Sequence, residues 1–376
     1  MVKPEKLLGD LIALPSVNPA FLPANHSQAG EQRVAEFLAG IATAAGLDVQ
    51  FQRVLPGRSN LLARLTPSGK ISQRVLLAPH LDTVPIFEPS QLQPQRKGGR
   101  LHGRGACDTK GSVAAMLAAV CELAAGKRRP QHTEIVFAGL VDEENAQAGS
   151  RALGASGFQA NLAIVGEPTD CEVITAHKGS LWLRLETKGK SAHGAKPELG
   201  RNAVHAMARI VDALESDYAA QLQRRRHPLL GHGTVNVGVI RGGTQPNIVP
   251  DACSITIDRR TLPGETEAGV RREITALLKR KKLSARFTSE KAAPTSALET
   301  DPRLPLVRQF MAQAGQKRPA GVDYFCDAAV LAGHGIPSVV FGPGDIAQAH
   351  TMDEWISLKS LNQAKDILLS FLGSLP

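Results

Sequence analysis

The stretch RVLLAPHLD, residues 74–82, decides the fold that this sequence is expected to adopt. The apolar run from Val75 to Ala78 is typical of a strand buried on both faces of a sheet. His80 and Asp82 follow at the end of that strand, where open α/β sheets bind their ligands. Residues two apart on an extended segment face the same way, so Asp82 can orient the His80 ring towards a metal. Alone, the two residues are more typical of a polar pair that binds no metal.

Strands and helices alternate on both sides of this stretch. Helical spacing of apolar residues runs from Val34 to Ala45 and from Ser112 to Ala125. Buried strands are predicted at Thr133–Leu140, Leu162–Val165 and Ser338–Phe341. This alternation predicts an α/β fold with a mostly parallel mixed sheet flanked by helices.

The middle of the chain has a different pattern and predicts a second domain. Its strands alternate apolar and polar residues, and its helices are amphipathic, in the order β-α-β-β-α with a last strand near Ser284–Thr288. The elements are Leu181–Thr187, Asn202–Leu214, Thr234–Ile240, Ser254–Arg259 and Glu267–Arg280. This order predicts a ferredoxin-like α+β unit. We therefore expect a catalytic domain in two parts, residues 1–177 and 292–376, with a lid domain, residues 178–291, inserted between them.

Four further segments place carboxylate or imidazole groups at predicted strand ends or in the loops after them. They contain Asp108 in a glycine-rich loop, Asp142-Glu143-Glu144, Glu167 before a proline, and His350. Taken singly, Asp108 suits an ordinary helix cap and the acidic triplet a solvated turn. Together with His80 they offer imidazole and carboxylate but no thiolate, on one edge of one sheet. That set of ligands predicts two divalent ions of the zinc or cobalt type, with Asp108 able to bridge them.

These five segments, in this order, resemble the metallopeptidase family of acetylornithine deacetylase, succinyl-diaminopimelate desuccinylase, aminoacylase-1 and glutamate carboxypeptidase. The resemblance covers nearly the whole chain and implies a zinc-peptidase type of catalytic domain. It implies that His80, Asp108 and Glu167 bind one metal ion, either Zn²⁺ or Co²⁺. It implies that Asp108, Glu144 and His350 bind the other. Glu143 corresponds to the general base, with Asp82 beside His80.

The inserted domain resembles the same family. The motifs are Gly189-Lys190-Ser191-Ala192-His193-Gly194, Gly242-Gly243-Thr244-Gln245-Pro246-Asn247 and Asp258-Arg259-Arg260. The resemblance implies that His193 stabilises the oxyanion, often across a dimer interface, and that the lid forms a homodimer. It also implies that Asn247 and Arg259 hold the substrate carboxylate.

The last motif, Phe341-Gly342-Pro343-Gly344, resembles acetylornithine deacetylase most closely, which places Gly342 and Gly344 at the substrate. The segment Tyr324-Phe325-Cys326-Asp327-Ala328 departs from that pattern and leaves the acyl group open. The expected activity is hydrolysis of an N-acyl-L-amino acid. The first candidate substrate is acetylornithine, which would place the protein in arginine biosynthesis. The alternatives are a desuccinylase, or a carboxypeptidase or dipeptidase that releases a C-terminal acidic residue. A binding protein without catalysis is the alternative from another class.

Composition limits the remaining classes. The net charge of +9 is dispersed along the chain and aromatic residues make up only 4%, which argues against a nucleic-acid partner. No apolar run approaches the roughly 18 residues that span a bilayer. Five cysteines without a C-x-x-C pair indicate reduced thiols, and the N-terminus has no pattern of an export signal. We therefore expect a cytoplasmic protein with no membrane partner.

Overall fold

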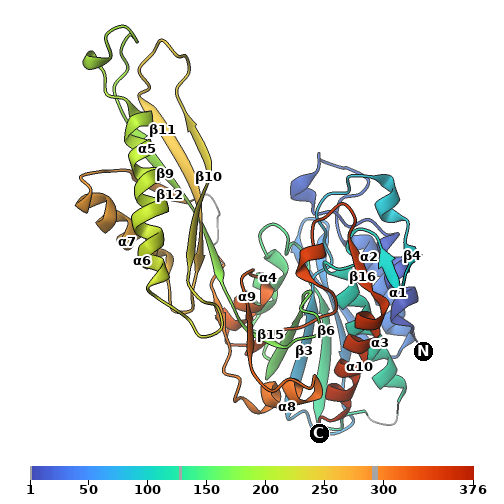
Figure 1. Cartoon of the computed structure of the whole chain (residues 1–376). Coiled ribbons are helices and arrows are strands. Elements are labelled where there is room, and N and C mark those ends of the chain that lie inside the picture. Colours follow the sequence, from blue (N-terminus) through green and yellow to red (C-terminus); the bar gives the residue numbers. More distant parts are fainter. Residues whose placement is uncertain (1, 127–128, 290–294) are drawn as a thin grey trace. The chain divides into compact units, whose positions relative to one another are not determined.

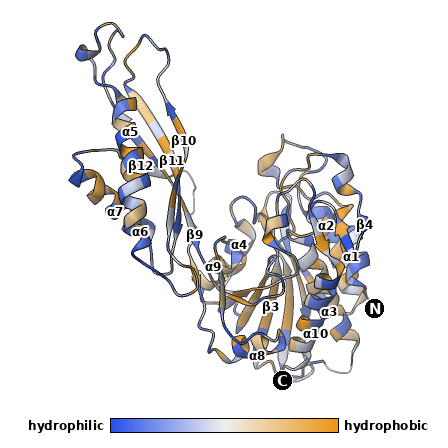
Figure 2. Ribbon diagram, in the orientation of Figure 1, coloured by the Kyte–Doolittle hydropathy of each residue, from blue (hydrophilic) through white to orange (hydrophobic). Residues whose placement is uncertain are grey.

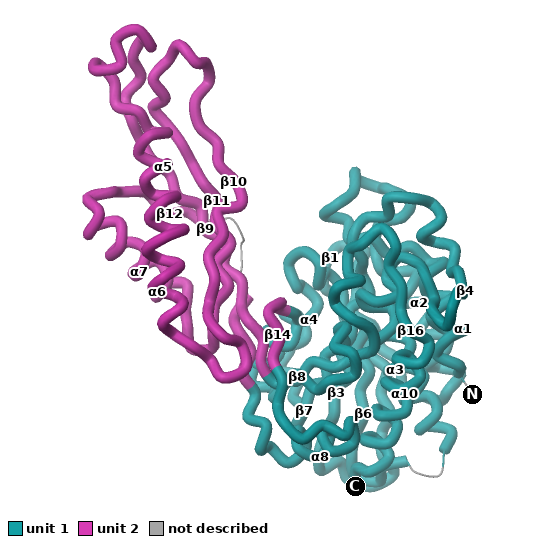
Figure 3. The backbone as a smooth tube through the Cα atoms, in the orientation of Figure 1, with its two compact units in different colours: residues 1–175, 300–320, 326–376 teal, residues 176–299, 321–325 magenta. Residues whose placement is uncertain are grey.

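The computed structural model describes residues 2–126, 129–289 and 295–376 (Figure 1). The chain divides into two compact units, coloured separately in Figure 3. Unit 1 consists of residues 1–175, 300–320 and 326–376, and unit 2 of residues 176–299 and 321–325. These limits differ from the expected boundaries after residues 177 and 291, because β13 (Leu298–Glu299) pairs with Ala176 and His177 at the start of unit 2.

The sheet of unit 1 has a parallel centre. β3 (Gln73–Pro79) lies between β6 (Thr133–Gly139) and β7 (Leu162–Gly166), and β15 (Ser338–Val340) follows beyond β7; all these pairs are parallel. Every residue of β6, β7 and β15 is buried, which explains why these strands are apolar without alternation. Figure 2 shows this hydrophobic centre. Since the strands are parallel, the loops that follow them meet at one edge of the sheet.

Antiparallel strands complete the sheet on both sides. β1 (Asp48–Leu55) and β2 (Arg58–Leu65) form a hairpin that pairs with β6. On the other side, β8 (Ile174–His177) pairs with β15, and β14 (Ala320–Val322) pairs with β8. The predicted mixed sheet is therefore confirmed, although the sequence analysis had not predicted the hairpin.

Helices flank this sheet. They are α1 (Pro4–Ile12), α2 (Gln32–Ala44), α3 (Lys110–Ala125), α4 (Ala148–Ala155), α8 (Pro305–Gln313), α9 (Asp327–Gly333) and α10 (Leu358–Gly373). The alanine-rich α3 is almost wholly buried and packs against α1 and α10, because its small side chains allow close approach. Beside α3, the rings of Phe341 and Phe371 lie 4.9 and 4.8 Å from that of Phe310 and join α8, α10 and the end of β15 in one core.

A small three-stranded sheet joins two loops of unit 1. β16 (Trp355–Ser357) pairs with β5 (Arg100–His102), which pairs with β4 (Gln95–Lys97). These three strands are short and were not predicted. They bring the segment after His350 next to the segment before Asp108.

Unit 2 is a four-stranded antiparallel sheet covered by helices. Its strand order is β10-β11-β9-β12, formed by β9 (Gly179–Lys188), β10 (Thr234–Gly242), β11 (Ala252–Thr261) and β12 (Arg286–Ser289). Its helices are α5 (Ala203–Ala213), continued through a π-turn (Leu214–Tyr218) into α6 (Ala219–Gln223), and α7 (Glu267–Arg280). Alternate residues of β9, Leu181, Leu183 and Leu185, are buried in one core with residues of these helices. The predicted ferredoxin-like unit is confirmed.

Among the helices of the described ranges, none is both long enough and apolar enough to cross a membrane.

Candidate metal centre

Two groups of possible metal ligands lie at the edge of the sheet of unit 1. His80, Asp108 and Glu167 form one group, and Asp108, Glu144 and His350 form the other. Within each group the ligand atoms lie within 4.8 Å of one another. These are the two sets that the family resemblance implies, and Asp108 belongs to both.

The elements described above explain this convergence. His80 directly follows β3 and Glu167 directly follows β7, while Glu144 lies in the turn after β6. Asp108 lies in the loop before α3, and His350 follows the short 3-10 helix η5 (Ile346–Gln348). The loops after parallel strands share one edge, so residues far apart in the chain meet there.

Asp108 occupies the middle of the site. Its Oδ1 lies 3.1 Å from His80 Nε2, and its Oδ2 lies 3.2 Å from His350 Nε2. His350 Nε2 is also 3.2 Å from Glu144 Oε2, and His80 Nε2 is 3.9 Å from Glu167 Oε1. Each carboxylate oxygen of Asp108 therefore faces a different histidine, as a bridging ligand requires.

The carboxylates here are crowded and buried. Burial, together with the nearby charge of Glu167, raises the pKa of Glu143 well above its usual value. Burial raises the pKa of Glu167 in the same way, and burial with the neighbouring Asp108 raises that of Glu144 to about 7. Glu144 Oε1 is buried without a hydrogen-bond partner among residues 2–126, 129–289 and 295–376. A site of imidazole and oxygen donors in which buried carboxylates outnumber the histidines suits two divalent metal ions.

Asp82 supports His80 and the acidic turn together. His80 Nδ1 lies 3.0 Å from the Asp82 carbonyl oxygen and 3.4 Å from Asp82 Oδ1, which turns Nε2 towards Asp108. The Asp82 carboxylate also accepts hydrogen bonds of 3.1 Å from the backbone N–H groups of Glu143 and Glu144. One side chain thus positions groups from two strand ends, as supporting residues of metal sites do.

A buried polar network behind Asp82 was not predicted. Asn18 Nδ2 donates to Asp82 at 2.7 Å and to Asp142 at 3.0 Å. Arg58 donates to Asp142 at 2.9 Å and forms a two-pronged ion pair with Glu31. Asp142 has φ of 70°, so these bonds hold the acidic turn in a conformation that non-glycine residues rarely adopt. The residues come from distant segments, and no local pattern in the sequence connects them.

Glu354 holds the loop that carries Asp108. Its carboxylate accepts hydrogen bonds from the backbone N–H groups of Gly105, Cys107 and Asp108 at 2.8, 2.8 and 2.9 Å. It also pairs with Arg104 at 2.8 Å, and both side chains are buried. Successive N–H groups that converge on one anion fix a loop firmly. Glu354 follows His350 by four residues, and this role of its carboxylate was not predicted.

Asp327 is a further buried acid that the sequence analysis quoted without a role. It begins α9 and accepts a hydrogen bond of 2.6 Å from Ser150 Oγ. Burial raises its pKa to about 6, and its charge acts on Glu143 and Glu167. Asp327 thus adds to the negative charge that a metal ion would offset.

The two predicted glycines pack against the segments of two candidate ligands, Gly342 against Glu167 and Gly344 against Cys107, which precedes Asp108. A side chain at Gly342 would meet Ser112 Oγ at 2.2 Å and the Glu167 carbonyl oxygen at 2.5 Å. Gly344 has φ of 90°, and a side chain there would lie 2.7 Å from Cys107 Sγ. Both glycines therefore allow the backbone to approach closely beneath the site. Their contact with substrate stays a prediction.

The predicted lid residues all lie in unit 2. His193 and Asn247 are on neighbouring segments, since Gly194 N donates to the Asn247 carbonyl oxygen at 2.7 Å. Arg259 is fully buried, and its Nη2 donates to both oxygens of Glu265 at 2.8 Å. Arg260 lies on the opposite face of β11. The roles of His193, Asn247 and Arg259 at a substrate stay predictions, and Arg259 has its guanidinium engaged by Glu265.

Known proteins with similar sequences share one family and one activity name. Residues 76–374 match peptidase family M20/M25/M40. The acetylornithine deacetylase of Myxococcus xanthus is 31% identical over 342 residues, which cover 86% of this chain and 87% of the relative. That of Edwardsiella ictaluri is 30% identical over 374 residues, covering 96% and 95%.

Solved structures share the fold. Aminopeptidase PepT from Bacillus cereus has a TM-score of 0.78 at 23% identity and covers 99% of this chain and 98% of its own. The YXEP protein from Bacillus subtilis, a dinuclear metal binding peptidase from the M20 family, has a TM-score of 0.71 at 14% identity and covers 98% and 96%.

The metal-free protein should release protons when it takes up zinc at pH 7. Hydrogen bonds to Asp108 and Glu144 raise the pKa of His350 to about 10, and burial raises that of Glu144 to about 7. His350 and part of the Glu144 population therefore carry protons that the metal must displace, and affinity should fall as the pH drops below 7. Calorimetry in buffers of different ionisation enthalpy measures the number of protons. Binding that is independent of pH between pH 6 and 8 would contradict these ligands.

Proposed function

The chain belongs to peptidase family M20/M25/M40 and is a metal-dependent hydrolase, and we propose that it cleaves the amide bond of an N-acyl-L-amino acid. The membership confirms the resemblance inferred from the five ligand segments. The observation that carries the proposal is the pair of ligand groups that share Asp108, with the acidic turn of Glu143 beside them. We propose zinc or cobalt as the metal, since the donors are imidazole and carboxylate.

Bound divalent ions would supply electrophilic polarisation of the amide carbonyl and a lowered pKa of water. His80, Asp108 and Glu167 would hold one ion, and Asp108, Glu144 and His350 the other. Glu143 is the proton carrier in this proposal. Its burial makes the carboxylate a stronger base than a solvated glutamate, so it can take a proton from the attacking water and deliver it to the leaving amine nitrogen. Asp82 holds the backbone N–H of Glu143 and thereby limits movement of the base.

The relatives favour a particular substrate. Both quoted relatives of about 30% identity are named acetylornithine deacetylases, which supports an acetylated amino acid and makes acetylornithine the first substrate to test. A metallo-carboxypeptidase from Sulfolobus solfataricus with a TM-score of 0.77 keeps peptide cleavage as the alternative. A location in the cytoplasm and a part in arginine biosynthesis would follow from acetylornithine.

Replacing Glu143 by glutamine tests the mechanism. We expect Glu143→Gln to keep both metal ions and to lower kcat by about 10²- to 10⁴-fold, because the amide cannot accept the proton. Metal content and turnover should be measured on acetylornithine, succinyl-diaminopimelate, acetylmethionine and a dipeptide that ends in glutamate. The matched control is Glu172→Gln, at an exposed glutamate of unit 1. A Glu143→Gln protein that retains most of its activity would exclude Glu143 as the base.

Two adjacent arginines of β11 differ in burial, and their replacement tests the role predicted for Arg259. Arg259 is buried against Glu265, whereas Arg260 is only partly buried, 2.9 Å from Asp258 and stacked 5.3 Å from the Phe325 ring centroid. We expect Arg259→Ala to lower the free energy of unfolding by about 1.5–3 kcal/mol, since it removes two charge-assisted hydrogen bonds to Glu265, which keeps Arg225 at 3.3 Å as a partner. Arg260→Ala should instead change it by less than about 1 kcal/mol, since the partly exposed pair with Asp258 is screened by water. Urea unfolding measures both effects; a stable Arg259→Ala protein with raised KM in steady-state kinetics would support the original assignment of Arg259.

We propose that unit 2 forms a homodimer through β10. Among the residues that the structure describes, this strand pairs with β11 alone, at an edge of the sheet, and Val239 and Ile240 are 43% and 56% exposed. An exposed apolar edge strand favours pairing with a second copy. Light scattering should give a dimer for the unaltered chain and a monomer for Ile240→Lys, while Ile71→Lys in unit 1 should leave the dimer intact. A monomer at micromolar concentration in the unaltered chain would contradict this interface.

A further inference from the structure

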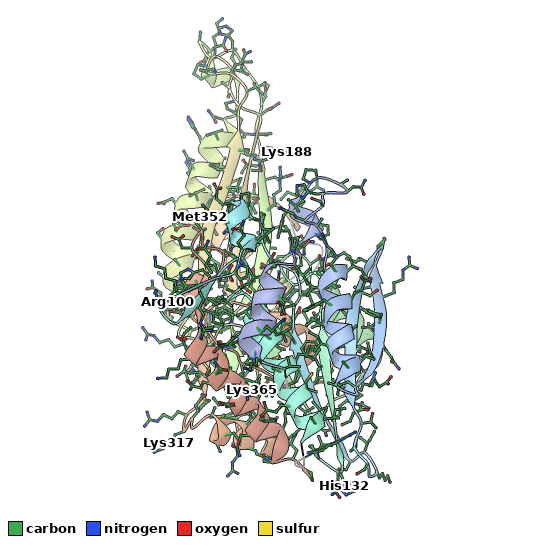
Figure 4. The ribbon with its side chains drawn as sticks, turned by 90° about the vertical axis from the view of Figure 1, so that its right-hand side faces the viewer. Arg100, His132, Lys188, Lys317, Met352 and Lys365 are labelled. Atoms are coloured by element: carbon green, nitrogen blue, oxygen red, sulfur yellow. The ribbon has the colours of Figure 1, made fainter. Side chains whose placement is uncertain are left out.

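Two large apolar side chains of unit 1 are exposed in loops that follow the segments of the candidate metal ligands His80 and His350. The exposed large apolar residues of unit 1 are Phe21, Phe51, Ile71, Phe87, Ile346 and Met352. The two most exposed are Phe87 at 57% and Met352 at 55%, and the latter is labelled in Figure 4. Phe87 follows Asp82 by five residues, and Met352 follows His350 by two. Exposed apolar groups that gather at a site are typical of ligand contacts.

A buried glutamine holds these two residues close together. Gln91 Oε1 accepts a hydrogen bond of 2.7 Å from the Phe87 N–H, and Gln91 Nε2 donates at 3.0 Å to the Met352 carbonyl oxygen. One side-chain amide thus joins the loop after His80 to the loop after His350. Gln91 is itself 7% exposed, so this link is part of the folded interior.

The Phe87 ring rests on a fixed support. The Arg104 guanidinium carbon lies 5.6 Å from the ring centroid, and Arg104 is buried. Glu354 and the Pro85 carbonyl oxygen hold this guanidinium at 2.8 and 3.1 Å. The same Glu354 carboxylate binds the backbone N–H of Asp108. The exposed ring and the bridging ligand are therefore positioned by one buried group.

We propose that Phe87 and Met352 form an apolar wall beside His350 that receives an apolar substituent of the substrate. The inference rests on the proposed amide hydrolysis but replaces acetylornithine, the substrate in the relatives' names, by another class: N-acyl amino acids with an apolar side chain or acyl chain. A rigid aromatic ring next to a flexible methionine can contact alkyl groups of different shapes. The competing interpretation is that the exposed carboxylates of Glu88 and Asp353 bind a cationic side chain such as that of ornithine. Water screens those exposed charges and weakens their attraction for a cation, whereas the removal of apolar surface from water lowers the free energy of the complex.

The test compares kcat/KM within one set of substrates. N-acetylglycine serves as the reference because it has no side chain. N-acetyl-L-methionine and N-acetyl-L-ornithine test the side chain, and N-hexanoylglycine tests the acyl chain. We expect at least one apolar substrate to exceed the reference by about 10- to 200-fold, the range that small apolar groups give in pockets. Phe87→Ala and Met352→Ala should each remove most of that advantage and leave N-acetylglycine turnover unchanged.

The matched control is Phe51→Ala, a phenylalanine of similar exposure, 46%, on β1 of the same unit. Three outcomes would each overturn the wall. The unaltered enzyme could hydrolyse apolar substrates and N-acetylglycine at equal rates, or it could prefer acetylornithine. The third outcome is a preference for apolar substrates that survives in both Phe87→Ala and Met352→Ala. If none of these substrates is hydrolysed by the zinc- or cobalt-loaded enzyme, amide hydrolysis itself fails. Calorimetry then tests the wall by itself, by measuring the binding of N-acetyl-L-methionine and of N-acetylglycine. Tighter binding of N-acetyl-L-methionine that is lost in Phe87→Ala supports the wall. Equal affinity for the two compounds overturns it.

Discussion

Buried carboxylates that repel one another are the constraint on which the rest of unit 1 depends. Glu143, Glu144 and Glu167 all have raised pKa values because they are removed from water and lie near further negative charge. Such a cluster is costly without cations or protons to offset it. The two histidines on either side of Asp108 offset part of this charge, and the donor set suits metal ions for the remainder. The parallel sheet makes the cluster possible by bringing its strand ends to one edge.

The surrounding hydrogen bonds keep this cluster in place. Asp82 and Glu354 both bind backbone N–H groups of the segments that carry ligands, so the ligands are fixed through the main chain as well as through their own side chains. Behind Asp82, Asn18 and Arg58 continue the network to Glu31. The carboxylates of the site are thus surrounded by polar side chains that are hydrogen-bonded to one another. This network limits the movement of Glu143, whose backbone N–H is bound by Asp82.

Much of the fold, and the convergence of the candidate ligands at one edge of the sheet, could be predicted from the sequence because strand ends follow from local patterns. His80 and Glu167 directly follow strongly apolar runs, and such runs predict buried parallel strands. Asn18, Arg58 and Glu31 could not be found in this way, since only the tertiary structure brings them together. The hairpin of β1 and β2 was missed although β1 alternates between polar and apolar residues from Asp48 to Gln52, because β2 has no such alternation to pair with it.

Arg259 shows how a local signal can be present and still be overlooked. It has the same parity along β11 as Ile255 and Ile257, which are buried in the core of unit 2. Side chains alternate between the faces of a strand, so this parity indicates the covered face for Arg259 and the other face for Arg260. The motif suggested a substrate contact, whereas the strand period indicated burial.

The bond between Glu354 and Asp108 joins residues 246 positions apart. Contacts so distant in sequence form late during folding, because a long loop must close before they can stabilise the chain. We therefore expect the Asp108 carboxylate to reach its final orientation late in the folding of unit 1. Metal capture by both ligand groups together would then follow folding instead of guiding it, in contrast to small zinc domains whose structure is nucleated by the ion.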